Sequence, residues 1–158
     1  RVMQNPVYID MFTALGGSAI PMAWGETFTA VQQGTIDGLE IPVAVIDANK
    51  YFEVTKYLSI TNHTYSVIHL MMSKRIFDKL PPSLQKAVRD AAVTATTAQR
   101  KASGANAKEL LATLQTKGMK VNPIADPAAF RATVKGIYDK YRPAIGPELL
   151  DEALAAVK

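Results

Sequence analysis

The sequence predicts an α/β fold with one long helix added to it. Residues 1–42 alternate short apolar segments, glycine-containing turns and helix-start signals, which is the order strand, turn, helix, strand. After Pro82 there is no proline up to residue 117, and the segment is rich in Ala, Leu, Lys and Gln, so a single helix is expected there. No internal repeat, low-complexity tract or flexible linker interrupts the 158 residues.

The composition is typical of a soluble globular protein, with 48% hydrophobic and 20% charged residues. No apolar run approaches the roughly 18 residues expected of a membrane span. The absence of cysteine excludes disulfides, thiolate metal sites and cysteine nucleophiles. The first residues show no signal-peptide pattern, but we expect the chain to be part of a longer protein, so this has no bearing on export.

The net charge of +4 is unevenly distributed along the chain. Residues 1–73 have three Lys/Arg against six Asp/Glu, whereas residues 74–158 have fifteen against eight. The basic residues are scattered through expected helices and are not interleaved with aromatic residues. They therefore indicate a solvated helical surface and not a nucleic-acid-binding face.

Three helices are expected in the first part of the chain. Asn5-Pro6 is a helix cap followed by a first-turn proline, and Gly16-Gly17 ends that helix. A second helix is expected over 26–33 and a third over 43–52. Strands are expected at residues 1–3, 19–22, 35–41, 57–61 and 64–73.

The long helix expected over about 82–117 would measure roughly 50 Å. A helix of that length exceeds one compact domain, so it should bridge two bodies or bend near Gly104. Gly118 is placed to cap its C-terminal end. Asp126-Pro127 begins a further helix that is expected to end before Pro143, and a last one is expected over 147–157.

No catalytic or metal-binding constellation is found in the sequence. The only two histidines, His63 and His69, do not have the spacing of a metal-ligand pair. Asp37 and Glu40 lie three residues apart, so on a strand their side chains would face opposite ways. No nucleophile elbow, phosphate-binding loop or dinucleotide glycine pattern is present. We therefore assign no catalytic residue, no metal and no cofactor.

Two residues are candidates for binding because of where they lie. Arg1 ends an expected strand beside a helix N-terminus, where its planar guanidinium can meet a carboxylate. The alternative is an ordinary surface arginine. Trp24, the only tryptophan, is expected in a loop before the second helix, either as core or interface packing or as the aromatic wall of a pocket.

Several strings of the sequence, taken together, resemble the substrate-binding proteins of tripartite ATP-independent periplasmic (TRAP) transporters, the DctP-like family. The agreement is collinear over residues 1 to about 95 and plausible to the end of the chain. The strings are Arg1-Val2-Met3, Pro21-Met22-Ala23-Trp24-x-Glu26, Gln32-Gln33-Gly34-x-x-Asp37-Gly38-x-Glu40-x-Pro42, Tyr51-Phe52-Glu53-Val54, Lys56-Tyr57-Leu58, Thr61-Asn62-His63 and Leu80-Pro81-x-x-Leu84-Gln85-Lys86.

The resemblance implies a periplasmic-binding-protein-like bilobed α/β fold, here an incomplete C-terminal fragment without most of the N-terminal lobe. Residues 1–62 would form the ligand-binding lobe, and 63–80 the hinge strands that return to the other lobe. The bridging helix would occupy 81–118, and 119–158 would be C-terminal helices that pack on the lobes.

The resemblance also implies a binding protein and not an enzyme. It would capture an organic acid anion in the bacterial periplasm by closing a cleft, with a hinge near 61–73, and deliver the acid to TRAP membrane permease subunits. By position, Arg1 matches the arginine that clamps the carboxylate, Trp24 an aromatic residue of the pocket, and His63 a histidine that orders water around the acid. Ile41 stands where the family often has asparagine, which suggests a smaller or more apolar acid.

Two alternatives remain open. One is an enzyme on a similar bilobed scaffold, with His63 and Glu40 as acid and base, which requires the two side chains to share one pocket. The other is a chain that self-associates without binding ligand, because unpaired strand edges and apolar helix faces invite a homodimer.

Overall fold

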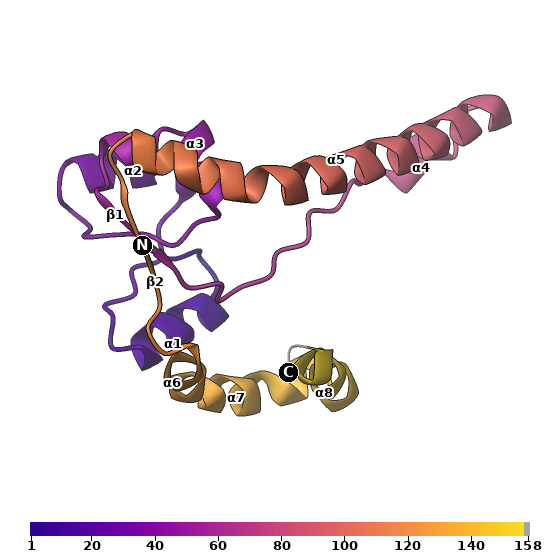
Figure 1. The fold of residues 1–158 in the computed structure, drawn as a ribbon. Helices are drawn as coiled ribbons and strands as arrows, with labels where there is room; N and C mark the ends of the chain where they lie inside the picture. Colours follow the sequence, from indigo (N-terminus) through magenta and orange to yellow (C-terminus); the bar gives the residue numbers. More distant parts are fainter. Residues whose placement is uncertain (157–158) are drawn as a thin grey trace. The chain divides into compact units, whose positions relative to one another are not determined.

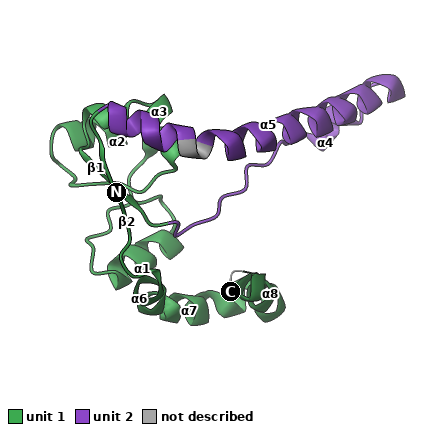
Figure 2. Cartoon of the chain, in the orientation of Figure 1, with its two compact units in different colours: residues 1–61, 118–158 green, residues 62–117 purple. Residues whose placement is uncertain are grey.

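The computed structural model describes residues 1–156 of the chain, apart from the side chains at 107 and 108. The chain divides into two compact units, one made of Arg1–Thr61 with Gly118–Lys158 and the other of Asn62–Lys117 (Figure 2). The C-terminal segment thus belongs to the same unit as the first 61 residues. The finer boundaries expected from the sequence, including a separate hinge at 63–80, stay a prediction.

Three α-helices form the N-terminal part of the first unit, each overlapping a helix that the sequence predicts (Figure 1). They are α1 (Pro6–Ala14), α2 (Trp24–Gln32) and α3 (Val43–Ala48). The Asn5 side chain accepts a hydrogen bond from the Val7 backbone at 2.9 Å, which satisfies one of the unpaired amides that begin α1. Beyond α2, Gly34 has a φ of +70°, the left-handed conformation that ends a helix at little cost for glycine.

A two-stranded parallel sheet, β1 (Tyr57–Ile60) with β2 (Lys120–Pro123), joins the two chain segments that make up the first unit. Tyr57 pairs with Lys120 and Ile60 with Pro123, and the whole second unit lies between them in the sequence. A single parallel bridge connects Val2, which precedes α1, with Pro21, which follows it. The predicted strand at 57–61 is confirmed, whereas β2 was not expected.

Other strand predictions are wrong for the described residues. The expected strands 1–3 and 19–22 are reduced to the Val2–Pro21 bridge, and neither 35–41 nor 64–73 contains a strand. A segment rich in β-branched and apolar residues forms a stable strand only where a second strand supplies its backbone hydrogen bonds. These segments have no such neighbour among the described residues.

The expected helix over 43–52 is two pieces, α3 and a short 3-10 helix, η1 (Tyr51–Glu53). Lys50, between them, has a φ of +56°, a left-handed conformation that a continuing α-helix excludes. The break turns Tyr51 into the first residue of a new turn, which decides where its side chain lies.

The C-terminal segment forms α6 (Pro127–Thr133), α7 (Lys135–Ile145) and α8 (Pro147–Ala156). The Asp126 carboxylate caps α6 by accepting from the Ala128 and Ala129 backbones at 2.9 and 3.0 Å. The expected end before Pro143 is wrong: α7 includes this proline, although the proline removes one backbone hydrogen bond, and the helix ends two residues later at Ile145. Val157, the expected last residue of α8, lies outside the described residues.

A polar contact joins α7 to α1 within the first unit (Figure 1). Asp10 accepts a hydrogen bond from the Tyr141 hydroxyl at 2.6 Å and forms an ion pair with Lys140. These contacts lower the pKa of the Asp10 carboxyl, the Lys140 hydrogen bond most and the Tyr141 bond next. The residues buried in this unit come from both of its segments: Val2, Thr27, Ala30, Ile36, Ile46, Tyr51, Met119, Val134 and Leu150.

The second unit consists of an extended segment followed by two helices, α4 (Lys74–Phe77) and α5 (Pro82–Thr116). The 35-residue α5 confirms the long helix predicted over about 82–117. Gly118, with a φ of +96°, follows it as expected of a C-terminal cap. No helix among the described residues is long and apolar enough to cross a membrane.

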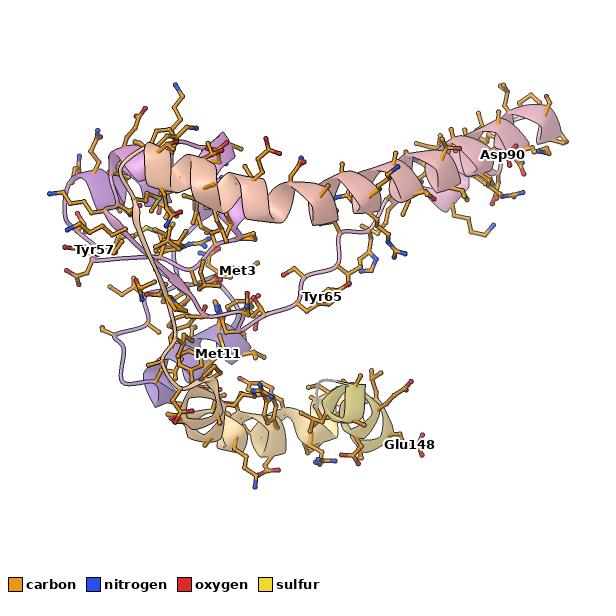
Figure 3. All side chains as sticks on the ribbon, viewed as in Figure 1. Met3, Met11, Tyr57, Tyr65, Asp90 and Glu148 are labelled. Carbon is orange, nitrogen blue, oxygen red and sulfur yellow. The ribbon has the colours of Figure 1, made fainter. Side chains whose placement is uncertain are left out.

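The extended segment of this unit exposes a row of large apolar side chains. Tyr65 is 93% exposed, Ile68 91% and Met71 82%, and Figure 3 shows the Tyr65 side chain projecting from the segment. Residues 62–73 have no helix or strand assignment. A strand-like sequence is therefore present here, and no strand among the described residues pairs with it.

Candidate functional site

The site begins at Arg1, which the Val2–Pro21 bridge fixes in the first unit. The Val2 amide donates to the Ile20 carbonyl at 3.0 Å, and the Met22 amide donates to the Val2 carbonyl at 3.3 Å. The backbone nitrogen of Arg1 also donates to the Gly38 carbonyl at 2.7 Å. These bonds bring together the start of the chain, the segment before α2 and the turn around Gly38.

The Arg1 guanidinium is held by one of its nitrogens and leaves the others available. Its Nε donates to the Met22 carbonyl at 3.1 Å. Among the described residues, no acceptor or carboxylate pairs with its two terminal Nη groups. Two parallel N–H groups of that kind match the two oxygens of a carboxylate.

Trp24 supplies an aromatic surface beside the guanidinium. The Arg1 Cζ atom lies 5.6 Å from the centroid of the Trp24 ring, within the range of a cation–π interaction. Trp24 is the first residue of α2 and not part of a loop, which corrects the placement expected from the sequence. The residue remains 41% exposed, so it is not a core residue.

Tyr51 completes an aromatic cluster with Trp24 and Phe28. Its ring centroid lies 5.5 Å from that of Trp24 and 5.3 Å from that of Phe28, in tilted and edge-on arrangements that suit aromatic pairs. The side chain is 1% exposed. Sequence reasoning gave Tyr51 no role, although it lies in the Tyr-Phe-Glu-Val string on which the resemblance partly rests.

The Tyr51 hydroxyl is buried and makes no hydrogen bond with any described residue. An unpaired buried hydroxyl costs about 1–3 kcal/mol relative to a paired one. Burial raises the pKa of Tyr51, while the positive charge of Arg1 opposes that rise, so the two groups lie within electrostatic range of each other. The hydroxyl is therefore protonated near neutral pH and is available as a donor.

Ile41 and His63 are the remaining residues predicted for the site. Ile41 is half-buried and lies three residues after Gly38 in the irregular segment before α3. His63 belongs to the second unit, whereas Arg1, Trp24 and Glu40 belong to the first. Within the described part of the chain, no three His, Cys, Asp or Glu side chains gather as a metal site would require.

Arg1, Trp24 and Tyr51 thus combine a positive charge, an aromatic face and unpaired hydrogen-bond donors. In the described residues no carboxylate or carbonyl uses up the Nη groups or the buried hydroxyl. Unpaired donors beside a positive charge are complementary to an anion with oxygen atoms. It contains no nucleophile with an adjacent base that would indicate a reaction.

Comparison with known proteins gives a consistent result. Residues 1–143 match the family described as bacterial extracellular solute-binding protein, family 7, DctP. A solute-binding protein of Verminephrobacter eiseniae is 37% identical over 156 residues, which cover 99% of this chain and 47% of that protein.

Solved structures agree in sequence and in fold. The sugar acid binding protein DctPAm of Advenella mimigardefordensis, in complex with galactonate, has a TM-score of 0.91 and 35% identity, over 99% of this chain and 51% of that one. A TRAP periplasmic solute-binding protein of Polaromonas, bound to D-erythronate, has a TM-score of 0.89 and 38% identity, over 96% and 51%. The chain therefore spans about half the length of the proteins it matches.

Proposed function

Because the chain belongs to family 7 of the bacterial extracellular solute-binding proteins, the DctP family, we propose that the protein captures an organic acid anion for a TRAP transporter. It works in the periplasm and delivers the acid to the membrane permease subunits of that transporter. The homologues and structural neighbours are solute-binding proteins and not enzymes, which argues against acid–base chemistry by His63 and Glu40.

The observation that carries the proposal is the state of the Arg1 guanidinium. Its Nε is anchored on the Met22 carbonyl and its face lies against Trp24, while its Nη groups have no partner in the described residues. An arginine oriented in this way loses little conformational entropy when it binds a carboxylate. The sugar acids bound by the Advenella and Polaromonas proteins carry such a carboxylate.

The finer features of the site are part of the same proposal. Ile41 contributes an apolar wall, which favours an acid with fewer hydroxyl groups than a sugar acid, and His63 tunes the hydration or hydrogen bonding of the carboxylate. The acid is bound by closure of two lobes about residues 61–73, because contacts made only in the closed state shift the equilibrium toward it.

The test is Arg1→Lys in the full-length protein, measured by calorimetry with galactonate, D-erythronate, succinate and benzoate. We expect the wild type to bind at least one of these acids and the variant to bind it at least tenfold more weakly, because lysine cannot form the two parallel hydrogen bonds. A preference for succinate or benzoate would support the role of Ile41, and a preference for galactonate would contradict it.

Arg89→Lys is the matched control for this substitution. The Arg89 guanidinium also lies over an aromatic ring, 4.8 Å from the Phe77 centroid, but in the second unit. The same chemical change there should leave acid affinity at the wild-type value. Equal affinities of the wild type and Arg1→Lys, or an equal loss in both variants, would refute the role of Arg1.

A second proposal concerns the 158-residue chain by itself, which we expect to form homodimers through residues 65–72. The exposed row that includes Tyr65, Ile68 and Met71 has a strand-forming sequence and no strand partner among the described residues. Apolar segments with unpaired backbone groups associate with a second copy. Light scattering should show a dimer, and Ile68→Ser should weaken it. The control Val93→Ser, on the exposed surface of α5, should leave the dimer unchanged. A clean monomer would contradict the proposal.

A further inference from the structure

Three adjoining side chains in the first unit have hydrogen-bond donors without protein acceptors. The Nη groups of Arg1, the indole N–H of Trp24 and the hydroxyl of Tyr51 make no hydrogen bond with any described residue. Arg1 lies over the Trp24 ring, and that ring contacts the ring of Tyr51. Arg1 and Trp24 can satisfy their donors with water because both are partly exposed. Tyr51 cannot, because its oxygen is shielded from solvent.

We propose that the Tyr51 hydroxyl is a second donor of the acid-binding site and gives its hydrogen bond to an oxygen of the carboxylate that Arg1 binds. The inference rests on the proposed function, since it assigns a residue to the same site. Phenylalanine would fill the aromatic cluster equally well and would leave no polar atom unpaired. The hydroxyl therefore calls for an acceptor that the described protein atoms do not provide.

The position of the hydroxyl favours the carboxylate as that acceptor. Arg1 and Tyr51 both lie against the Trp24 ring, and the charge of Arg1 acts on Tyr51, so an anion drawn to the guanidinium enters the region in which Tyr51 lies. Trp24 lies against both residues, and no hydrogen bond fixes its half-exposed ring. For an acid held by Arg1 to reach the hydroxyl, a side chain that covers it must move, and Trp24 is the ring that contacts both residues.

The backbone holds Tyr51 in place for this role. Its carbonyl accepts from the Thr55 hydroxyl at 2.8 Å and from the amides of Val54 and Thr55 at 3.0 and 2.8 Å. The left-handed residue Lys50 sets the start of the turn. A donor on a fixed turn keeps its direction when the ligand arrives, which is a condition for a specific hydrogen bond.

The experiment is Tyr51→Phe in the full-length protein, with binding of galactonate, D-erythronate, succinate and benzoate measured by calorimetry. We expect about tenfold weaker binding, since hydrogen bonds to a charged acceptor are among the stronger ones. The loss should be similar for every acid that the wild type binds, because all four carry a carboxylate. The thermal midpoint of the ligand-free variant should equal or exceed that of the wild type, because an unpaired hydroxyl has been removed.

Tyr57→Phe is the control, since Tyr57 is 68% exposed on β1 and loses the same hydroxyl without touching the cluster. Unchanged affinity in Tyr51→Phe would overturn the inference, while a loss in Arg1→Lys would leave the proposed function standing. A lower thermal midpoint together with weaker binding would reveal a structural hydrogen bond and would also overturn it. A loss confined to the polyhydroxy acids would place the bond on a sugar hydroxyl and overturn the assignment to the carboxylate. If the wild type binds none of the four acids, the proposed function and this inference fall together.

Discussion

Replacing Trp24 by leucine separates the two roles that its ring has in the structure. The ring faces the Arg1 guanidinium at 5.6 Å and contacts the ring of Tyr51 at 5.5 Å. Leucine retains an apolar side chain at the start of α2 but has no aromatic face. Phenylalanine at the same position retains a face of smaller area and serves as the matched comparison.

The structure sets the size of the two effects. A cation–π contact at a partly exposed site is worth about 0.5–1 kcal/mol. The aromatic pair with Tyr51 adds about 0.5–1.5 kcal/mol. Trp24→Leu should therefore lower the free energy of unfolding by about 1–2.5 kcal/mol. Of these two ring contacts, only the one with Arg1 bears on the guanidinium, which the Met22 carbonyl also holds. Acid affinity should therefore fall by about two- to fivefold, which corresponds to 0.5–1 kcal/mol.

Two assays on the full-length protein test this division. Denaturant titration gives the free energy of unfolding, and calorimetry with the tightest acid of the four gives the affinity. Trp24→Phe should lie between the wild type and Trp24→Leu in both. If Trp24→Leu destabilises the protein but binds the acid as tightly as the wild type, Trp24 packs against Arg1 without orienting it. If Trp24→Phe and Trp24→Leu are equally impaired, the argument from the aromatic face is wrong.

The remaining predictions concern stability. The pKa of Asp10 is lowered in the folded protein, so its contribution to stability should be complete above its ordinary pKa of about 4 and be lost as the pH falls through the lowered value. The difference in thermal midpoint between the wild type and Asp10→Asn should therefore shrink between pH 6 and pH 3. A constant difference would contradict this. Asp126→Ala should lower the free energy of unfolding by about 1 kcal/mol through loss of the α6 cap, whereas Asp126→Asn, which keeps the acceptor, should not. Gly118→Ala should lower the free energy of unfolding by about 1 kcal/mol or more, because alanine is strained at a φ of +96°. The strain is in the backbone alone, since a Cβ at this position would meet no neighbouring atom. An unchanged free energy of unfolding in a denaturant titration would show that the backbone relaxes freely.

The sequence predicts the helices well because their signals are local. Asn5-Pro6 and Asp126-Pro127 are caps that act within one turn, and they begin α1 and α6 as expected. The strands were predicted less well because a strand depends on a partner that is distant in the sequence. Residues 64–73 have the right composition for a strand and no partner in the described chain, while β2 exists because β1 pairs with it.

The site shows the same contrast between local and distant information. Arg1 and Trp24 were predicted through their positions in strings shared with a family, and the structure brings the two side chains together. Tyr51 was not predicted, because its burial depends on the break at Lys50 and on rings from a different helix. The roles of Ile41 and His63 stay predictions, since they concern a bound acid.

The pairing of Tyr57 with Lys120 has a consequence for how the chain folds during synthesis. The two strands are separated by the whole of the second unit, so β1 leaves the ribosome long before its partner exists. At ordinary translation rates, roughly 60 residues take about 3–12 s to synthesise. During that interval the Arg1 segment can form its bridge to Pro21, but the buried Met119 and Leu150 side chains are still missing. The first unit is therefore completed only by the last quarter of the chain.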